Sequence, residues 1–205
     1  HDPVLFEMDL DQPEVHEGGH STDVITGEAL GLDTNRGGIV SPYQVPDDVK
    51  QVAVPALIFF DRTLTYREVD DIVEGLAAGL QDKGLQPGER VSLFMPNCPQ
   101  LVMAYHAVWR SGGVAVPSNP LYTSAEFAHQ ARDAGSRFAI VLSMLHDRVK
   151  AIRDETPLEH VVVTNIKEYF KGPMRALFTL LRERKDGHRV DIGEDANTYD
   201  WHEVV

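Results

Sequence analysis

The chain of 205 residues is 42% hydrophobic and 25% charged, which is ordinary for a globular protein with one or two domains. No apolar run approaches the ~20 residues that cross a bilayer, and no basic-then-apolar leader is seen, so we expect neither a membrane span nor a secretory signal. Cys98 is the single cysteine, which excludes an internal disulfide and favours a reducing, cytoplasmic compartment.

The net charge of −13 is unevenly distributed. Residues 1–48 hold eleven acids and one base, Arg36, for a net of −10, whereas the other 157 residues hold 21 acids and 18 bases, for a net of −3. An acidic arm repels phosphates, so this distribution argues against nucleic acid as the main partner. Because residues 1–50 also lack a sustained hydrophobic period, we expect them to form an extended or partly disordered arm, and residues 51–205 to form an α/β domain.

The regular pattern begins with ALIFF (56–60), which predicts a short strand followed by a turn at residues 61–62. Thr65 and Glu68 have the spacing of a capping box, and apolar residues recur on one helical face after them. We therefore expect a helix that starts at this box and stops at Gly84.

An alternation of strands and helices follows. The predicted strands are 91–96, 113–117, 138–143 and 160–164. The first predicted helix is 98–111, with Asn97 as its cap. A second helix starts at the capping box of Thr123 and Glu126 and ends near Gly135, and a third spans 145–155. Continuous apolar strands that alternate with helices predict a mostly parallel sheet with helices on both faces.

Open parallel sheets bind ligands beyond the carboxyl ends of their strands, where this chain has PNCPQ (96–100), PSNPLYT (117–123) and SM (143–144). The ligand-facing candidates in these segments are Asn97, Asn119 and Tyr122. Pro117 lacks an N–H and should end its strand, and Pro120 keeps the residue before it out of helical geometry, so we favour a rigid supporting loop over a catalytic one.

The motifs that hold phosphates or carry nucleophiles are missing from these 205 residues. We find no G-x-G-x-x-G, no G-x-x-x-x-G-K-[ST] and no G-x-S-x-G; the glycines of the domain serve turns and helix ends. The sequence alone thus indicates no site for a triphosphate.

HEGGH (16–20) matches the zinc-protease pattern H-E-x-x-H, which requires both histidines on one helical face. Two glycines inside the motif would each cost a helix ~1 kcal/mol, and no amphipathic helix surrounds them. We interpret HEGGH as a solvated loop that binds metal adventitiously, with a zinc hydrolase as the alternative.

Cys98 stands at a predicted helix N-terminus, which favours a thiolate, but no base accompanies it and its helix is apolar. We interpret Cys98 as a small core residue and His106, on the same helix, as a hydrogen-bonded core histidine. His129 and His146 fall on helix positions that we expect to be exposed.

Residues 167–185 hold six bases and two acids, with Pro173 at a helix start and an apolar face that includes Leu177 and Leu181. We favour a helix whose apolar face caps the sheet edge; the alternative is peripheral contact of residues 173–185 with the inner, anionic face of a membrane. The chain then continues as a polar loop with a short terminal helix.

Taken together, LTYRE (64–68), GERV (88–91), PNCPQ and VAVPSNPLYTSAEF (114–127) resemble the opening of the adenylate-forming acyl-CoA synthetases, in the order and spacing of that family. The resemblance runs from about Pro55 to Thr164, and more loosely through FKGPMRALFTLLRERKDG. Within the family, PNCPQ and NPLYT are most similar to the long-chain fatty-acid–CoA ligases.

The resemblance implies a two-step reaction: a fatty carboxylate attacks ATP, with Mg²⁺ balancing the phosphate charge, to give an acyl-adenylate and pyrophosphate, and CoA then displaces AMP. The family's catalytic motifs are a Ser/Thr/Gly-rich loop, Tyr-Gly-x-Thr-Glu, Thr-Gly-Asp and a lysine in a C-terminal domain, and none is found here. The resemblance therefore implies that this chain is the N-terminal part of such an enzyme and is inactive alone. It implies no catalytic or cofactor-binding residues within these 205 residues. ATP, Mg²⁺ and CoA would serve the full-length protein.

Two features depart from the family pattern. VPDDVKQVAV (45–54) poorly fills the place of a regular helix, and the acidic arm has no counterpart in the family.

The expected partners are a fatty-acid substrate, the remainder of the enzyme and a second copy of the chain, which would bind through the apolar surface that a missing half would expose. The alternatives are another acyl- or aryl-CoA ligase and a non-catalytic α/β binding module.

Overall fold

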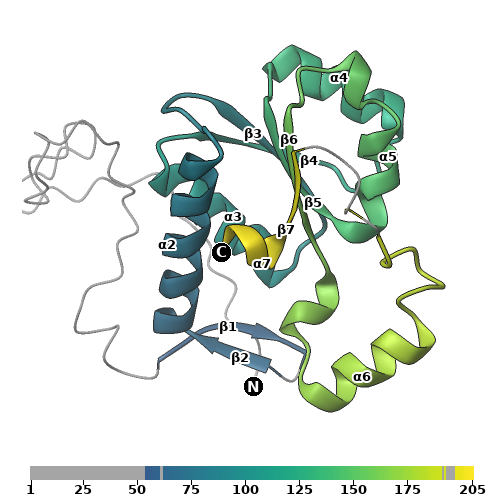
Figure 1. The fold of residues 1–205 in the computed structure, drawn as a ribbon. Helices are drawn as coiled ribbons and strands as arrows, with labels where there is room; N and C mark the ends of the chain where they lie inside the picture. Colours follow the sequence, from purple (N-terminus) through teal and green to yellow (C-terminus); the bar gives the residue numbers. More distant parts are fainter. Residues whose placement is uncertain (1–53, 61, 191, 193–196) are drawn as a thin grey trace, which may run out of the picture. The chain divides into compact units, whose positions relative to one another are not determined.

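A computed structural model describes residues 54–60, 62–190, 192 and 197–205 of the chain (Figure 1). The arm at 1–50 and the HEGGH motif lie outside these residues. The strands are β1 (Pro55–Phe59), β2 (Arg62–Thr65), β3 (Arg90–Phe94), β4 (Val114–Ser118), β5 (Phe138–Leu142), β6 (His160–Thr164) and β7 (Thr198–Asp200). The helices are α2 (Tyr66–Asp82), α3 (Pro99–Arg110), α4 (Ser124–Ala134), α5 (His146–Lys150), α6 (Gly172–Leu181) and α7 (Trp201–Val204).

Five strands form one parallel sheet in the order β4-β3-β5-β6-β7. Helices α2, α3 and α7 lie on one side of the sheet, and α4 and α5 lie on the other (Figure 1). The described part of the chain is therefore a three-layer α/β/α unit, which confirms the predicted fold class.

Strand β5 shows why both faces are covered. All five of its residues are buried, and they alternate between two cores. Phe138, Ile140 and Leu142 join the cluster under α2, α3 and α7, whereas Ala139 and Val141 join the cluster under α4 and α5. A strand that is apolar on both faces requires a helical layer on each side.

The two predicted capping boxes are confirmed. The N–H of Thr65 donates to Glu68 at 2.7 Å, and the N–H of Thr123 donates to Glu126 at 2.8 Å. These backbone bonds, reinforced by the threonine hydroxyls, hold the pKa of both glutamates below the usual value. Gly135, at φ 63°, closes α4 as expected.

Several boundaries differ from expectation near prolines and in short segments. Asn97 does not cap α3: the N-cap is Cys98, and Pro99 at the first helical position has no N–H that a cap would need to satisfy. Pro117 does not end β4, because β4 is an edge strand and tolerates a proline that donates no ladder bond. The helix expected at 145–155 is only α5 flanked by 3₁₀ turns, since Pro157 holds Thr156 extended.

The ends of the domain also differ from expectation. The predicted first strand does not join the parallel sheet; β1 pairs with β2 in an antiparallel hairpin in which Phe60 has a positive φ of 51°. Strand β7, in a segment expected to be loop, adds an edge to the sheet before the predicted terminal helix, α7. The favoured role of the basic helix was wrong: α6 has no buried residue, and the sheet edges are β4 and β7.

Helix α7 packs against α2 at two glycines. A Cβ built on Gly75 would lie 2.4 Å from the oxygen of Val205, and one on Gly79 would lie 1.9 Å from the oxygen of Val204. Both distances are shorter than van der Waals contact. The absence of side chains at these two positions therefore permits the close approach of α7.

We expect Gly79→Ala to destabilise the domain by about 1–3 kcal/mol, because the new methyl group overlaps backbone of α7. Urea unfolding followed by circular dichroism measures the change. The matched control is Gly172→Ala at the start of α6, where a Cβ would meet no atom within 4 Å, and which should be neutral or slightly stabilising. Equal stability of Gly79→Ala and the wild-type protein would contradict the packing of α7 on α2.

Candidate functional site

The parallel sheet brings the carboxyl ends of β3, β4, β5, β6 and β7 to one edge. The three predicted segments follow β3, β4 and β5 at this edge, as expected from the strand order. The segments after β6 and β7 join them there, although the sequence did not single them out.

The three predicted ligand-facing residues do not form a common pocket. Asn97 and Asn119 are exposed, and Asn119 uses its Oδ1 to accept a bond from the N–H of Leu121 at 3.0 Å. Tyr122 is half-buried and packs against the core under α4 and α5. The conformation of Asn119 is thus explained by its own turn.

Two of the segments that carry the resemblance, PNCPQ and VAVPSNPLYTSAEF, are tied to the fold by long polar side chains. Gln100 of PNCPQ is fully buried, and its Nε2 donates to the carbonyl oxygen of Asn165 at 3.0 Å. Arg148 donates from Nη1 to the carbonyl oxygens of Pro120 and Tyr122, at 3.3 and 2.7 Å. These bonds fix the loops after β3 and β4 against β6 and α5, as expected of a rigid support.

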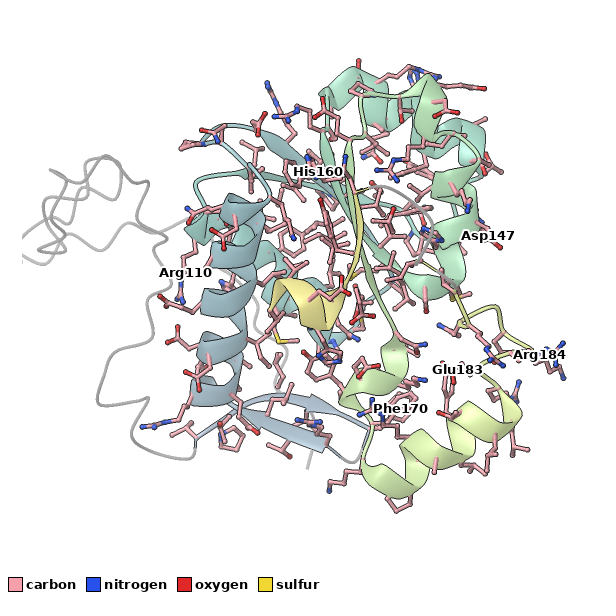
Figure 2. The ribbon with its side chains drawn as sticks, in the orientation of Figure 1. Arg110, Asp147, His160, Phe170, Glu183 and Arg184 are labelled. Carbon is pink, nitrogen blue, oxygen red and sulfur yellow. The ribbon has the colours of Figure 1, made fainter. Side chains whose placement is uncertain are left out.

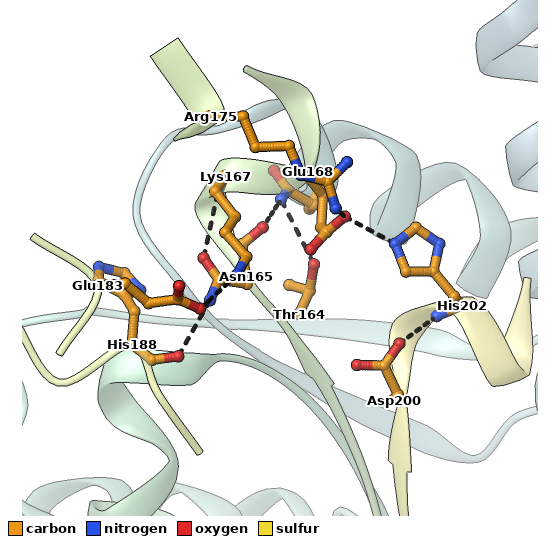
Figure 3. Close-up of polar contacts among 10 residues, drawn as sticks. Thr164, Asn165, Lys167, Glu168, Arg175, Glu183, His188, Asp200 and His202 are labelled. Carbon is orange, nitrogen blue, oxygen red and sulfur yellow. Dashed lines mark hydrogen bonds and ion pairs between the residues drawn. The ribbon is translucent and has the colours of Figure 1, made fainter. Parts of the chain in front are cut away.

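A pocket of about 190 Å³ lies beyond β5, β6 and β7. Its polar lining comes from the ends of these strands and from the segment after α6: Ser143, Thr164, Asn165, Lys167, Glu168, Glu183, His188, Arg189 and Asp200. Asn97, Asn119 and Tyr122 do not line it. Most of the polar lining groups interact with one another, as Figure 3 shows.

Asn165 organises this network. Its Nδ2 donates to Glu183 at 3.2 Å and to the carbonyl oxygen of His188 at 3.0 Å, while its Oδ1 accepts from the N–H of Lys167. Lys167 also forms an ion pair with Glu183. The network therefore closes the segment after α6 onto the end of β6 (Figure 3).

Ser143 and His188 form a buried pair, with 2.8 Å between Oγ and Nδ1. Burial lowers the pKa of His188 against the opposing influence of Asp186 and Glu183, so the imidazole is neutral at pH 7. A serine beside a neutral histidine is the first half of a hydrolytic triad. Here both residues are at least 94% buried at the wall of the pocket, and we interpret the pair as a structural tie between the end of β5 and the segment after α6.

The other residues singled out from the sequence have ordinary roles. Cys98 is buried, and desolvation raises the pKa of its thiol, which confirms the core interpretation and makes it a poor nucleophile. His106 is half-buried with its ring edge-on to Trp109, and His129 is exposed as predicted. His146 was predicted to be exposed but is buried, because it is the first residue of α5 and lies on the side of that helix, with Val149, that packs against the domain.

No three His, Cys, Asp or Glu side chains among the described residues gather as a metal site. Of the cationic side chains that line the pocket, Lys167 is paired with Glu183, whereas Arg189 is exposed. Across the described part of the chain, no helix is long and apolar enough to cross a membrane.

The sequence model of the family described as AMP-binding enzyme matches residues 47–190 of this chain. The match covers 144 of the 205 residues, so the chain belongs to the AMP-binding enzyme family. The fold is similar to that of coronafacic acid ligase from Pectobacterium brasiliense, which superposes with a TM-score of 0.57 at 20% identity, over 74% of this chain and 26% of that one.

Two relatives refine the comparison. The long-chain-fatty-acid–CoA ligase of Bacillus subtilis is 34% identical over 144 residues, which are 70% of this chain and 25% of that protein. The 4-coumarate–CoA ligase 1 of Solanum tuberosum is 31% identical over 108 residues, or 53% of this chain and 20% of that protein. The chain thus spans about a quarter or less of the length of these relatives.

The buried His188 predicts a pH-dependent stability. A histidine whose folded-state pKa is lowered stabilises the fold fully above its unfolded-state pKa of about 6.5, and this contribution is lost as the pH falls below that value. We expect the melting temperature to fall from pH 7 to pH 5, and to fall less in His188→Gln. Differential scanning fluorimetry across this range measures both slopes.

His129→Gln is the matched control, because His129 is exposed on α4. It should keep the wild-type slope. A His188→Gln slope equal to that of the wild-type protein would contradict a buried, neutral His188. His106 and His160, whose pKa values are also lowered by burial, account for the slope that remains.

Proposed function

We propose that this chain is the N-terminal part of a long-chain fatty-acid–CoA ligase, which joins a fatty acid to CoA at the expense of ATP and releases AMP and pyrophosphate. The observation that carries the proposal is the 34% identity to the Bacillus subtilis ligase over 144 residues. The potato relative supports the second candidate, a ligase of the same family that acts on an aryl acid.

Within this enzyme, the chain acts as the scaffold for groups on the rest of the polypeptide. The support for this role is geometric: Gln100 and Arg148 hold the loops at the ligand-facing edge, and most of the polar groups of the pocket interact with one another. We propose that Asn97, Asn119 and Tyr122 face substrate or neighbouring segments of the full enzyme from this edge. ATP, Mg²⁺ and CoA would bind mainly to residues outside the described ones.

The proposal extends to cellular location and assembly. A cytoplasmic enzyme fits the single buried cysteine. The exposed Ile58 and Val114 offer apolar surface to the remainder of the enzyme or to a second copy. A non-catalytic binding module is the remaining alternative to the ligase.

Pyrophosphate release tests the proposed reaction. The intact gene product, mixed with ATP, Mg²⁺, CoA and fatty acids of graded length, should release pyrophosphate in proportion to acyl-CoA formed. Residues 1–205 alone should release none above the rate without protein, because the catalytic motifs of the family are not found in this sequence. 4-Coumarate in place of the fatty acid tests the aryl alternative.

The outcomes separate the candidates. Release with fatty acids but not with 4-coumarate supports the long-chain ligase, and the reverse supports the aryl-CoA ligase. No release by the intact product with either acid would refute both and favour the binding module. Release by residues 1–205 alone would refute the scaffold role.

A further inference from the structure

Helix α6 exposes an apolar face. Four of its five large apolar side chains, Met174, Leu177, Leu180 and Leu181, which we call the α6 patch, are 38%, 53%, 82% and 63% exposed. At 100° per residue, these four positions fall within one side of the helix. A ten-residue helix with no buried residue and four exposed large apolar ones has its apolar face unpartnered within the described structure.

Aromatic rings attach α6 to the domain and extend the apolar surface. The ring of Phe178 lies edge-on to Phe170 at 5.4 Å and to His188 at 5.3 Å, so this side of the helix faces the body. Phe60 at the hairpin tip, 65% exposed, stacks edge-on against the same Phe170 at 5.2 Å. Figure 2 shows Phe170 between the hairpin and α6. The α6 patch and Phe60 thus border one aromatic cluster.

The surroundings of α6 carry the opposite charge to the other described residues. Residues 167–190 hold seven bases and three acids, a net of +4, whereas the described residues outside this segment hold 10 bases and 14 acids, a net of −4. Each of the three acids is paired: Glu168 with Arg175, Glu183 with Lys167, and Asp186 with Arg182.

The remaining bases of this segment flank the helix. They are Lys171 before α6, and Arg184, Lys185 and Arg189 after it, all exposed, and none has an ion pair within the described residues. Figure 2 labels Arg184 beyond the end of α6, with its side chain pointing away from the body. Exposed leucines with cationic groups at both helix ends are the pattern of a helix that lies in a bilayer interface.

We propose that α6 and the hairpin tip dock onto the surface of an anionic lipid bilayer, with the α6 patch inserted among the acyl chains and the flanking bases on the headgroup phosphates. The local charge of +4 attracts an anionic surface, and the net charge of −4 on the other described residues is repelled by it, so within the described part of the chain electrostatics favour an orientation with α6 toward the lipid. A second copy fits less well, because a twofold contact between α6 patches would place the same bases against one another.

Lipid docking would also serve the proposed function, and this part of the inference rests on that function. A long-chain fatty acid partitions into bilayers, so docking brings the enzyme to its substrate. Lipid docking itself requires no ligase activity. The two can therefore fail separately, and the test below reads binding rather than turnover.

Vesicle flotation of the intact protein tests the proposal. We expect binding to vesicles that contain phosphatidylglycerol, and much weaker binding to pure phosphatidylcholine. The double variant Leu180→Glu/Leu181→Glu should reduce the partition coefficient roughly tenfold or more, since it removes apolar surface and adds two negative charges. Its melting temperature should match that of the wild-type protein, because both side chains are exposed.

Leu121→Glu is the matched control: Leu121 is 83% exposed, as Leu180 is at 82%, but it follows β4 and lies outside the α6 patch. It should leave flotation unchanged. Arg184→Glu/Lys185→Glu provides a second, independent measurement and should weaken binding and its dependence on salt.

Three outcomes would overturn the proposal. The first is no flotation of the wild-type protein with anionic vesicles. The second is equal flotation of the wild-type protein and Leu180→Glu/Leu181→Glu. The third is a wild-type oligomer that this variant converts to monomer by analytical ultracentrifugation, without vesicle binding, which would assign the α6 patch to a second copy instead.

Discussion

The burial of β5 on both faces is the constraint on which the rest of the described structure depends. Its five residues alternate strictly between the core under α2, α3 and α7 and the core under α4 and α5. Both helical layers must therefore be present for this strand to leave water. The parallel ladders with β3 and β6 then set the common edge at which every strand-end loop lies.

At that edge, polar side chains serve the fold rather than chemistry. Gln100, Arg148 and Asn165 each donate hydrogen bonds to backbone carbonyl oxygens of a neighbouring segment. The Ser143–His188 pair has the composition of a catalytic dyad but is enclosed. Loops held by such bonds form a rigid edge. The Bacillus subtilis relative is about four times as long as the part that matches this chain, and a rigid edge suits a domain that supports further segments of that length.

Helix α6, unlike β5, has an apolar face that the described structure leaves exposed. It is joined to the domain through Phe178 and the ion pair of Arg175 with Glu168, while its leucines remain in contact with solvent. The same amphipathic pattern that buries α2 against the sheet leaves α6 exposed, because no part of the sheet lies opposite it. An amphipathic face identifies a side that prefers to leave water, but not the surface that covers it.

The sequence by itself determined the layers, the two capping boxes, the four main parallel strands and the family, because each of these depends on local periodicity or on residues adjacent in the chain. It also indicated that Cys98 is a core residue. Only the tertiary structure decided that ALIFF forms a hairpin, that Pro117 lies inside an edge strand, that three residues near the end of the chain add β7, and that α6 is uncovered. The pocket network of Asn165, Glu183 and His188 joins residues 18 to 23 positions apart, with no spacing that local sequence could reveal, since such contacts follow from how the chain returns to the sheet edge.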